Sequence, residues 1–407
     1  MKRVFRRLCA GLLPTCALIL GLVGYTAHRF PDRYYATEAS GWTLHCGVLT
    51  SACEPLYRDG VQAAARTDGT AAQLRLWGVF PVKDVTVQLT KQPTVVLGGT
   101  PFGVKLYTDG VLVVGLSAVD GTGGSPAKRA GVQIGDTLLS VDGQAVATNE
   151  EVAARVAASG GRTLTLRLRR DGVEFDTQLT PAHSAAEGMY KIGMWVRDSS
   201  AGIGTLTFYD PESGVYAGLG HAICDVDTGK PLPVGGGELV PATVFGIVPS
   251  TAGKAGELRG CFESGVLGRL CANATTGIYG VAEGTPTDVE RIPLALKQQV
   301  TSGAAQVYTT LGGSTPAWYD IEIEQVRYHD NAPTQNMVIR ITDERLLAQT
   351  GGIVQGMSGS PIVQNGRLVG AVTHVFVNDP HKGYAIFAEN MYRTAAHVAA
   401  EALQDAA

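Results

Sequence analysis

The chain is poor in charged and aromatic residues and carries no basic stripe. Of its 407 residues, 17% are charged and 7% are aromatic, and 33 Lys and Arg nearly balance 37 Asp and Glu. Because no cluster of Lys and Arg occurs beyond the N-terminus, nucleic acid is not expected as a partner. The hydrophobic content of 45% argues against disorder, and the length allows about two or three domains.

Cysteines are few and odd in number. None of the seven forms a pair with metal-ligand spacing, so neither a metal nor another cofactor is predicted. Cys46 and Cys53, and likewise Cys261 and Cys271, are near enough in sequence to form bridges in an oxidising compartment. Of the other three, Cys9 and Cys16 lie in the N-terminal apolar run, and we interpret Cys224 as a small buried residue.

Only one long apolar run is present, the 18 residues from Leu8 to Tyr25, and four basic residues precede it. This length is enough to span a bilayer. The basic residues predict that the N-terminus stays in the cytoplasm and that the remaining chain is exported. Tyr25-Thr26-Ala27 is a poor cleavage site because Tyr is bulky. We therefore predict a retained signal-anchor over residues 1–27, the alternative being a removed signal peptide. Residues 28–92 are expected to form a tether that ends in one lead-in strand at 74–89.

Glycine is abundant, with 52 residues, and short Val, Leu, Thr and Tyr runs between turns predict a mainly β protein. Within it, Ser125–Gly143 resembles the signature of PDZ domains. Pro126 can begin a short helix and Asp142-Gly143 suits a tight turn. Residues 149–158 are then expected to form a longer helix, capped by Thr148 or Asn149. We assign an α+β PDZ domain to 93–182.

The PDZ resemblance implies a groove for a peptide. A ligand strand would add between the longer helix and an upstream strand, with its carboxylate held by loop amides. We place that loop at Thr100–Val104, so that Phe102, Gly103 and Val104 are the predicted peptide-binding residues. The alternative is a domain that only packs against its neighbour.

Near the C-terminus, Gly356-Met357-Ser358-Gly359-Ser360-Pro361 presents a serine between glycines. The glycines lack Cβ atoms, so the amides of Gly356 and Ser358 can face a developing oxyanion. The order Gly-x-Ser-Gly-x-Pro resembles the nucleophile loop of chymotrypsin-like serine peptidases. It does not match the Gly-x-Ser-x-Gly elbow of α/β-hydrolases, because position 360 is Ser. The alternative is a turn that merely joins two strands.

A serine nucleophile requires a base and, at best, a carboxylate that orients the base. His221 follows the turn Gly218-Leu219-Gly220 and is the candidate base, whereas His374 is its rival and is expected to line a pocket. Spacing does not choose among the candidate acids, which are Asp225, Asp227, Asp343 and Glu344.

Three segments, Gly218–Ile223, Thr350–Pro361 and Val372–Pro380, together resemble the stage IV sporulation protein B peptidases. That family combines a membrane anchor, a PDZ domain and a chymotrypsin-like double β-barrel, which would occupy 183–407 here. Carried over by position, the resemblance implies a triad of His221, Asp343 and Ser358, with Asp225 as the runner-up acid.

The resemblance further implies a membrane-tethered, exported serine endopeptidase at the forespore membrane, facing the intermembrane space. It would cleave itself, recognise itself through the PDZ domain, and cleave a membrane-bound regulator of an intramembrane protease, which activates a late sigma factor. Two alternatives stay open. One is a catalytically inactive PDZ adaptor at the membrane surface. The other is a cysteine hydrolase using Cys224, which has little support because no His-bearing loop is evidently paired with it.

Overall fold

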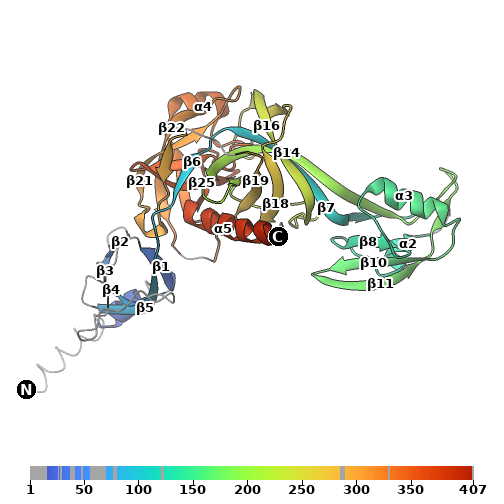
Figure 1. The fold of residues 1–407 in the computed structure, drawn as a ribbon, viewed down its shortest axis with the longest axis horizontal. Helices are drawn as coiled ribbons and strands as arrows, with labels where there is room; N and C mark the ends of the chain where they lie inside the picture. Colours follow the sequence, from blue (N-terminus) through green and yellow to red (C-terminus); the bar gives the residue numbers. More distant parts are fainter. Residues whose placement is uncertain are drawn as a thin grey trace, which may run out of the picture.

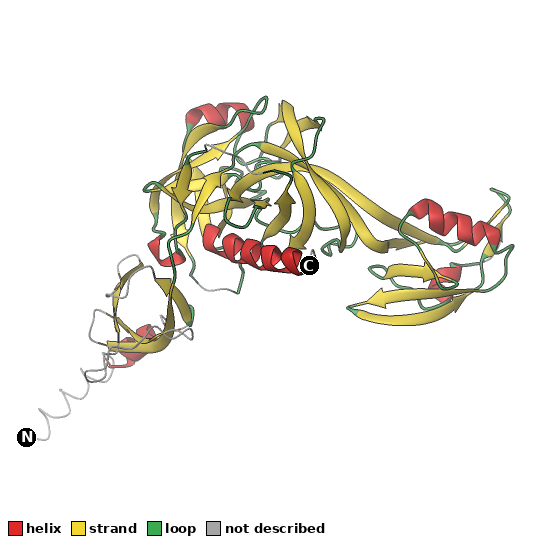
Figure 2. Ribbon diagram, viewed as in Figure 1, coloured by secondary structure: helices red, strands yellow, loops and turns green. Residues whose placement is uncertain are grey.

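The computed structural model describes residues 16–25, 27, 30–36, 42–46, 49–55, 70–76, 80–120, 123–284, 289–328 and 331–405. Strands dominate it and helices are few (Figure 2), which confirms the predicted mainly β class. A small N-terminal sheet, a central β-rich body and a PDZ-like body follow one another along the longest axis (Figure 1).

The predicted anchor over residues 1–27 lies largely outside the described residues. Residues 16–25 are helical. In the part of the chain that the structure describes, no helix is both long and apolar enough to cross a membrane. The anchor stays a prediction.

The predicted tether contains a five-stranded sheet with the order β1-β5-β4-β3-β2. Its strands are β1 (Arg33–Ala36), β2 (Trp42–Cys46), β3 (Leu49–Pro55), β4 (Thr70–Leu76) and β5 (Phe80–Leu89). The single lead-in strand expected over 74–89 is therefore wrong, because β4 and β5 are two antiparallel strands. The sheet packs on the central body, where the ring of Phe30 lies 6.3 Å from that of Tyr328.

The central body consists of two barrels, as predicted, and each has six strands. In the first, β7 pairs with both β16 and β14, which closes the ring β7-β16-β18-β19-β15-β14. These strands are β7 (Pro101–Leu116), β14 (Met194–Asp210), β15 (Val215–Gly218), β16 (Val234–Val248), β18 (Gly268–Ala274) and β19 (Gly277–Ala282). Phe102, Val104 and Leu106 alternate along β7 and point into its core.

The second barrel is closed in the order β21-β22-β23-β26-β25-β24. Its strands are β21 (Gly303–Thr309), β22 (Ala317–Val326), β23 (Met337–Ile341), β24 (Pro361–Gln364), β25 (Arg367–Val375) and β26 (Lys382–Phe387). Helix α4 (Glu344–Thr350) precedes the nucleophile turn, and α5 (Ala388–Asp405) packs against strands of both barrels. Smaller elements complete the body, namely β6 (Thr94–Leu97), β17 (Glu257–Phe262), β20 (Arg291–Pro293) and the 3-10 turn η1 (Lys297–Gln299).

The PDZ-like body has the predicted local structure. Its elements are α2 (Pro126–Arg129), β8 (Thr137–Val141), β9 (Gln144–Ala145), α3 (Asn149–Ala158), β10 (Leu164–Arg170) and β11 (Val173–Leu179), with the hairpin β12 (Ala182–Ser184) and β13 (Met189–Lys191). Thr148 caps α3, and its hydroxyl and the Glu151 carboxylate form a capping box. Asp142 and Gly143 have φ angles of 50° and 75°, as a tight hairpin turn requires.

The PDZ body is an insertion into the first barrel, so the expected boundaries at 93 and 182 do not match it. The strand β6 and the first half of β7 belong to the first barrel, where they pair with β14, β16 and β20. The PDZ core instead runs from Val111 to Ile192 and is completed by Met194 and Val196 at the start of β14.

The predicted PDZ loop at Phe102, Gly103 and Val104 is therefore wrong. Phe102 and Val104 are each 1% exposed in the first barrel. A Cβ on Gly103 would meet the ring of Phe262 at 2.5 Å. The segment has the apolar alternation of a buried strand, and it pairs with β14 on one side and with β16 on the other. This pairing leaves its backbone amides no freedom to hold a carboxylate.

Candidate active site

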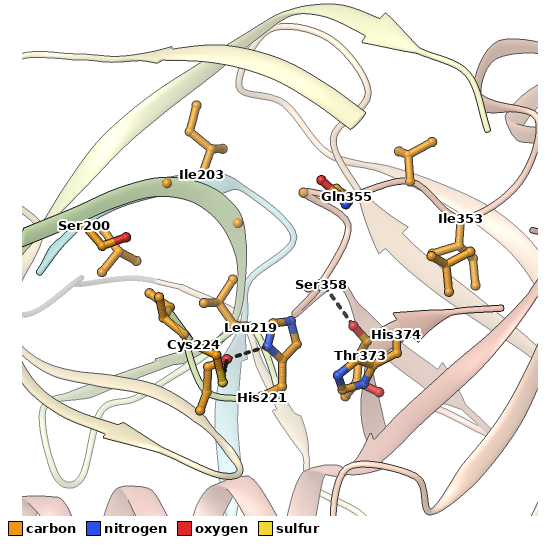
Figure 3. Close-up of a pocket in the computed structure, with 18 of the residues that line it drawn as sticks. Ser200, Ile203, Leu219, His221, Cys224, Ile353, Gln355, Ser358, Thr373 and His374 are labelled. Atoms are coloured by element: carbon orange, nitrogen blue, oxygen red, sulfur yellow. Dashed lines mark hydrogen bonds between the residues drawn. The ribbon is translucent and has the colours of Figure 1, made fainter. Parts of the chain in front are cut away.

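A cavity of about 550 Å³ lies where the two barrels meet. Both sequence-predicted reactive residues, His221 and Ser358, line it (Figure 3). The first barrel contributes His221, which follows β15, and the second contributes Ser358, between α4 and β24. The cavity thus brings together two side chains that lie 137 positions apart in the sequence.

The nucleophile turn has the backbone that its glycines predict. Gly356 and Gly359 have φ angles of 97° and 92°, which side-chain-bearing residues rarely adopt. A Cβ on Gly359 would lie 2.0 Å from the carbonyl oxygen of Thr205, so glycine also permits the close approach of the two barrels. Ser358 is half-buried, and its Oγ donates a hydrogen bond to the Thr373 carbonyl at 2.9 Å.

The turn also supplies two amides for an oxyanion. Gly356 and Ser358 line the cavity, and neither amide donates a hydrogen bond to any residue that the structure describes. By contrast, the neighbouring amides of Met357, Gly359 and Ser360 all donate to backbone carbonyls. Two free amides beside a serine hydroxyl are the donors that acyl transfer requires.

His221 is held as a base would be. Its Nδ1 lies 2.9 Å from the Ala222 carbonyl oxygen, which can only accept, so Nδ1 carries the hydrogen and Nε2 keeps its lone pair. Burial lowers the pKa of His221 below 6.5, and the Ala222 hydrogen bond opposes that shift. The imidazole is therefore neutral near pH 7 and able to accept a proton at Nε2.

His374 lines the same cavity, as expected for the rival histidine. Its ring centroid lies 4.9 Å from that of His221. Burial and the charge of His221 lower the pKa of His374. Two neutral imidazoles thus face each other at neutral pH.

The third predicted triad member is not beside His221 in this structure. The Asp343 carboxylate pairs with the Arg345 guanidinium at 2.8 Å and accepts hydrogen bonds from the first amides of α4. These donors hold its pKa at about 2. The reason is local, because Asp343 is the N-cap of α4 and the helix start uses its oxygen atoms.

The runner-up acid, Asp225, is likewise engaged elsewhere. It is 1% exposed and pairs with Arg197 at 2.7 Å. Its Oδ1 accepts the amides of Asp227 and Thr228, which closes a turn. Neither candidate carboxylate lines the cavity.

The cysteine expectations are wrong where the structure tests them. Cys261 and Cys271 are free thiols rather than a bridge, and Cys224 is exposed rather than buried. Cys224 lines the cavity near His221, and partial burial raises the pKa of its thiol. The side chains of Cys46 and Cys53 lie outside the described residues.

A second cavity, of about 850 Å³, lies along α3 of the PDZ body. Its walls are Val152 and Val156 of the helix and the segment from Met189 to Val196. At its edge, Ile192-Gly193-Met194 places a glycine with a φ of 68° between two apolar residues. This apolar-Gly-apolar pattern was the available signal for the groove, and it lies downstream of α3 rather than upstream.

Comparisons with known proteins decide the family. The model described as SpoIVB peptidase S55 matches residues 188–392, which is half of the chain, and a PDZ domain model matches residues 120–170. The chain belongs to the SpoIVB peptidase S55 family. This S55 peptidase family member thus combines the S55 peptidase region with a PDZ domain.

Curated relatives of this S55 peptidase match it over part of their length. A protein of Rhizobium meliloti named "Putative zinc metalloprotease" is 35% identical over 190 residues, covering 45% of this chain and 48% of the relative. One of the same description from Mesorhizobium japonicum is 32% identical over 131 residues, 30% of this chain and 36% of the relative. The chain spans about half or less of these relatives. In its described residues, no group of three or more His, Cys, Asp or Glu could hold a metal ion.

Solved structures similar to this S55 peptidase include the Rv3671c protease of M. tuberculosis in its active form, with 16% identity and a TM-score of 0.27 over 49% of this chain and 74% of that one. The HtrA-type protease AlgW with a decapeptide has 12% identity and a TM-score of 0.30 over 50% of this chain and 54% of that one. A PDZ domain of an SdrC-like protein from Listeria monocytogenes has 20% identity and a TM-score of 0.19 over 22% of this chain and 87% of that one.

Proposed function

We propose that the chain is a serine endopeptidase in which Ser358 is the nucleophile and His221 the general base. The observation that carries this proposal is that both side chains line one cavity in which the Gly356 and Ser358 amides are free. In the resting state Ser358 Oγ bonds the Thr373 carbonyl, so the first step is rotation of this hydroxyl toward His221.

The reaction then follows the order of serine peptidases. His221 Nε2 takes the proton as Ser358 Oγ attacks the substrate carbonyl, and the two amides stabilise the oxyanion. His221 returns the proton to the leaving amine, which breaks the peptide bond and leaves an acyl-enzyme. Water, deprotonated by the same imidazole, hydrolyses the ester and regenerates Ser358.

The orienting partner of His221 is proposed to be the Ala222 carbonyl. A carboxylate in this position fixes the tautomer and stabilises the imidazolium. The carbonyl at 2.9 Å supplies the first of these effects and part of the second. The triad role that the family resemblance gives Asp343 would require that residue to exchange Arg345 and the helix amides for His221.

The cavity walls favour an apolar substrate segment. Lys, Arg, Asp and Glu are absent from the described residues that line it, whereas Ile203, Leu219, Ile223, Ile353, Val354 and Val375 are present. A charged side chain entering such a pocket would lose its hydration without a partner. We infer cleavage beside an apolar residue.

The cellular setting is proposed from family membership. The peptidase would be tethered by the N-terminal segment at the forespore membrane, cleave itself, and cleave a membrane-bound regulator in a sporulation sigma-factor pathway. The PDZ groove along α3 supports recognition of a protein chain, because an apolar helix face and a strand edge suit an added peptide strand. The PDZ adaptor without activity is the alternative.

The test compares the full-length parent with Ser358→Ala and with Ser360→Ala as the matched control. Ser360 is buried and bonds Thr309, away from the cavity. A serine-directed fluorophosphonate should label the parent and Ser360→Ala but not Ser358→Ala, and mass spectrometry should find self-cleavage fragments only where the label binds. Labelling of Ser358→Ala would overturn the assignment, and an unlabelled, uncleaved parent would favour the adaptor.

A further inference from the structure

Strand β14 of the first barrel holds the nucleophile turn of the second through two buried threonines. The Thr205 hydroxyl donates to the Gly356 carbonyl at 2.7 Å, and the Thr207 hydroxyl donates to the Gly359 carbonyl at 2.7 Å. The Thr205 amide also donates to the Ser358 carbonyl at 3.0 Å. Alternation along a strand places residues two apart on the same face, so one face of β14 meets the whole turn.

Each of the two peptide groups that carry the oxyanion amides is fixed at its carbonyl end. The Gln355 carbonyl, in the same peptide group as the Gly356 amide, accepts from Leu258 at 2.8 Å. The Met357 carbonyl, paired in the same way with the Ser358 amide, accepts from Ser360 at 2.9 Å. Since N–H and C=O of a trans peptide point in opposite directions, these bonds leave both amides directed toward the cavity.

The peptide group between these two belongs to Gly356 and Met357, and its carbonyl is the one that Thr205 holds. Gly356 has no Cβ and a φ of 97°, so its own sterics restrain this peptide group weakly. Rotation of the group would turn the Gly356 and Ser358 amides apart. The Met357 amide holds one end of this group by donating to the Val354 carbonyl at 3.2 Å. The Thr205 hydroxyl holds the carbonyl end with the shorter bond.

We infer that Thr205 is a positioning residue for the oxyanion hole, acting through Gly356 from the barrel that carries His221. It is 2% exposed and does not line the cavity, so it acts without touching substrate. Its carbonyl oxygen also accepts from the Leu219 amide at 3.3 Å, two residues before His221. One residue therefore positions both the nucleophile turn and the turn that leads to the base.

Thr207 provides a matched control. It is equally buried, lies on the same strand and makes the same hydroxyl-to-glycine-carbonyl bond. Its acceptor, however, belongs to the Gly359–Ser360 peptide group, which does not adjoin either peptide group of the oxyanion hole. That group reaches the hole only through the hydrogen bond from the Ser360 amide to the Met357 carbonyl, so Thr207 acts on it less directly than Thr205 does.

The experiment measures kcat and KM of the full chain on a peptide with an apolar residue at the cleavage site, together with the rate of fluorophosphonate labelling and the melting temperature. Thr205→Val should lower kcat and the labelling rate by roughly 10- to 100-fold with little change in KM, because misdirected amides lose part of the hole's contribution of about 100-fold or more per donor. Thr205→Ser, which restores the hydroxyl, should recover most of the rate. Thr207→Val should lower the melting temperature as much as Thr205→Val does while lowering kcat far less.

Equal loss of kcat in Thr205→Val and Thr207→Val, or no rescue by Thr205→Ser, would reduce Thr205 to a structural residue and overturn the inference. So would an unchanged kcat in Thr205→Val. The inference rests on the proposed function, and labelling of the parent protein separates the two. An unlabelled parent refutes the peptidase mechanism itself, whereas a labelled parent with an unaffected Thr205→Val refutes only the role of Thr205.

Discussion

The imidazole rings of His221 and His374 contact each other in the wall of the cavity between the two barrels, with centroids 4.9 Å apart and planes inclined by 37°. Both rings are deprived of part of their hydration, and both pKa values are lowered from 6.5. The pair therefore resists protonation together, which preserves a neutral base in mildly acidic solution.

The first prediction concerns the pH dependence. The base is active when neutral, so kcat/KM should fall only as the pH drops through the lowered pKa of His221, at a midpoint below 6.5. His374→Gln should alter KM several-fold, because His374 lines the cavity, and should leave the midpoint below 6.5. His397→Gln on α5 is the control and should change neither quantity. A midpoint at or above 6.5 in the parent would contradict the lowered pKa.

The second prediction separates the two roles of Asp343. If Asp343 serves only as the N-cap of α4, Asp343→Asn should keep nearly full activity, since Asn caps helices well. Asp343→Ala should then lower the free energy of unfolding by about 1 kcal/mol. If Asp343 instead serves as the triad acid, Asp343→Asn should lose about 10,000-fold in kcat without unfolding. Kinetics and denaturant unfolding of both variants decide between these roles.

Asp343 also links stability to pH. Its pKa is about 2 in the folded protein against 3.8 for the ordinary group. A lowered pKa means that its contribution to stability is complete above 3.8 and is lost as the pH falls toward 2. The free energy of unfolding should be measured against pH for the parent and for Asp343→Asn. The difference between the two proteins should shrink as the pH falls over this range. A difference that does not depend on pH would contradict it.

The third prediction concerns Cys224. Its thiol is exposed in the cavity beside His221, so N-ethylmaleimide should block substrate entry and abolish activity. Because burial raises the pKa of this thiol, the inactivation should accelerate as the pH rises from 7 toward 9. Cys224→Ser should be active and insensitive to the reagent, whereas Cys261→Ser should be as sensitive as the parent. A Cys224→Ser variant that is folded but inactive would instead support the alternative of a cysteine hydrolase.

The fourth prediction concerns the PDZ groove. Ala153 is exposed on α3 and lines the groove, so Ala153→Trp should fill the space for a peptide strand. Processing of protein substrates should fall several-fold while hydrolysis of short peptides stays unchanged. Ala158→Trp, at an exposed position outside the groove, is the control. Equal loss of both activities in Ala153→Trp would indicate damage to the fold rather than to recognition.

Local chemistry made much of this molecule predictable. The N-cap at Thr148 and the turn at Asp142-Gly143 are encoded within a few residues, and both form as expected. The serine turn is likewise local, because Gly356 and Gly359 need φ angles that few residues allow. Each of these features depends on neighbours in sequence.

What the sequence did not predict depends on distant neighbours. In the sequence, Phe102 and Gly103 resemble a binding loop. In the structure, β14 and β16 pair with them on either side. Asp343 could serve either His221 or α4, and only the position of the helix start decides. Cys224 is apolar enough for a core, but the cavity wall leaves it exposed.

The insertion of the PDZ body between β7 and β14 has a consequence for how the chain folds during synthesis. Tyr107 precedes the inserted body and pairs with Ser199, which follows it, so the first barrel cannot close until the whole insert has left the ribosome. Once folded, the insert pairs Leu116 with Met194 at its own base and removes most of the entropy cost of joining its two ends. Early folding of the insert would thus nucleate the barrel. Deletion of the insert requires a new short turn between β7 and β14, since truncation from either terminus would open the barrel that carries His221.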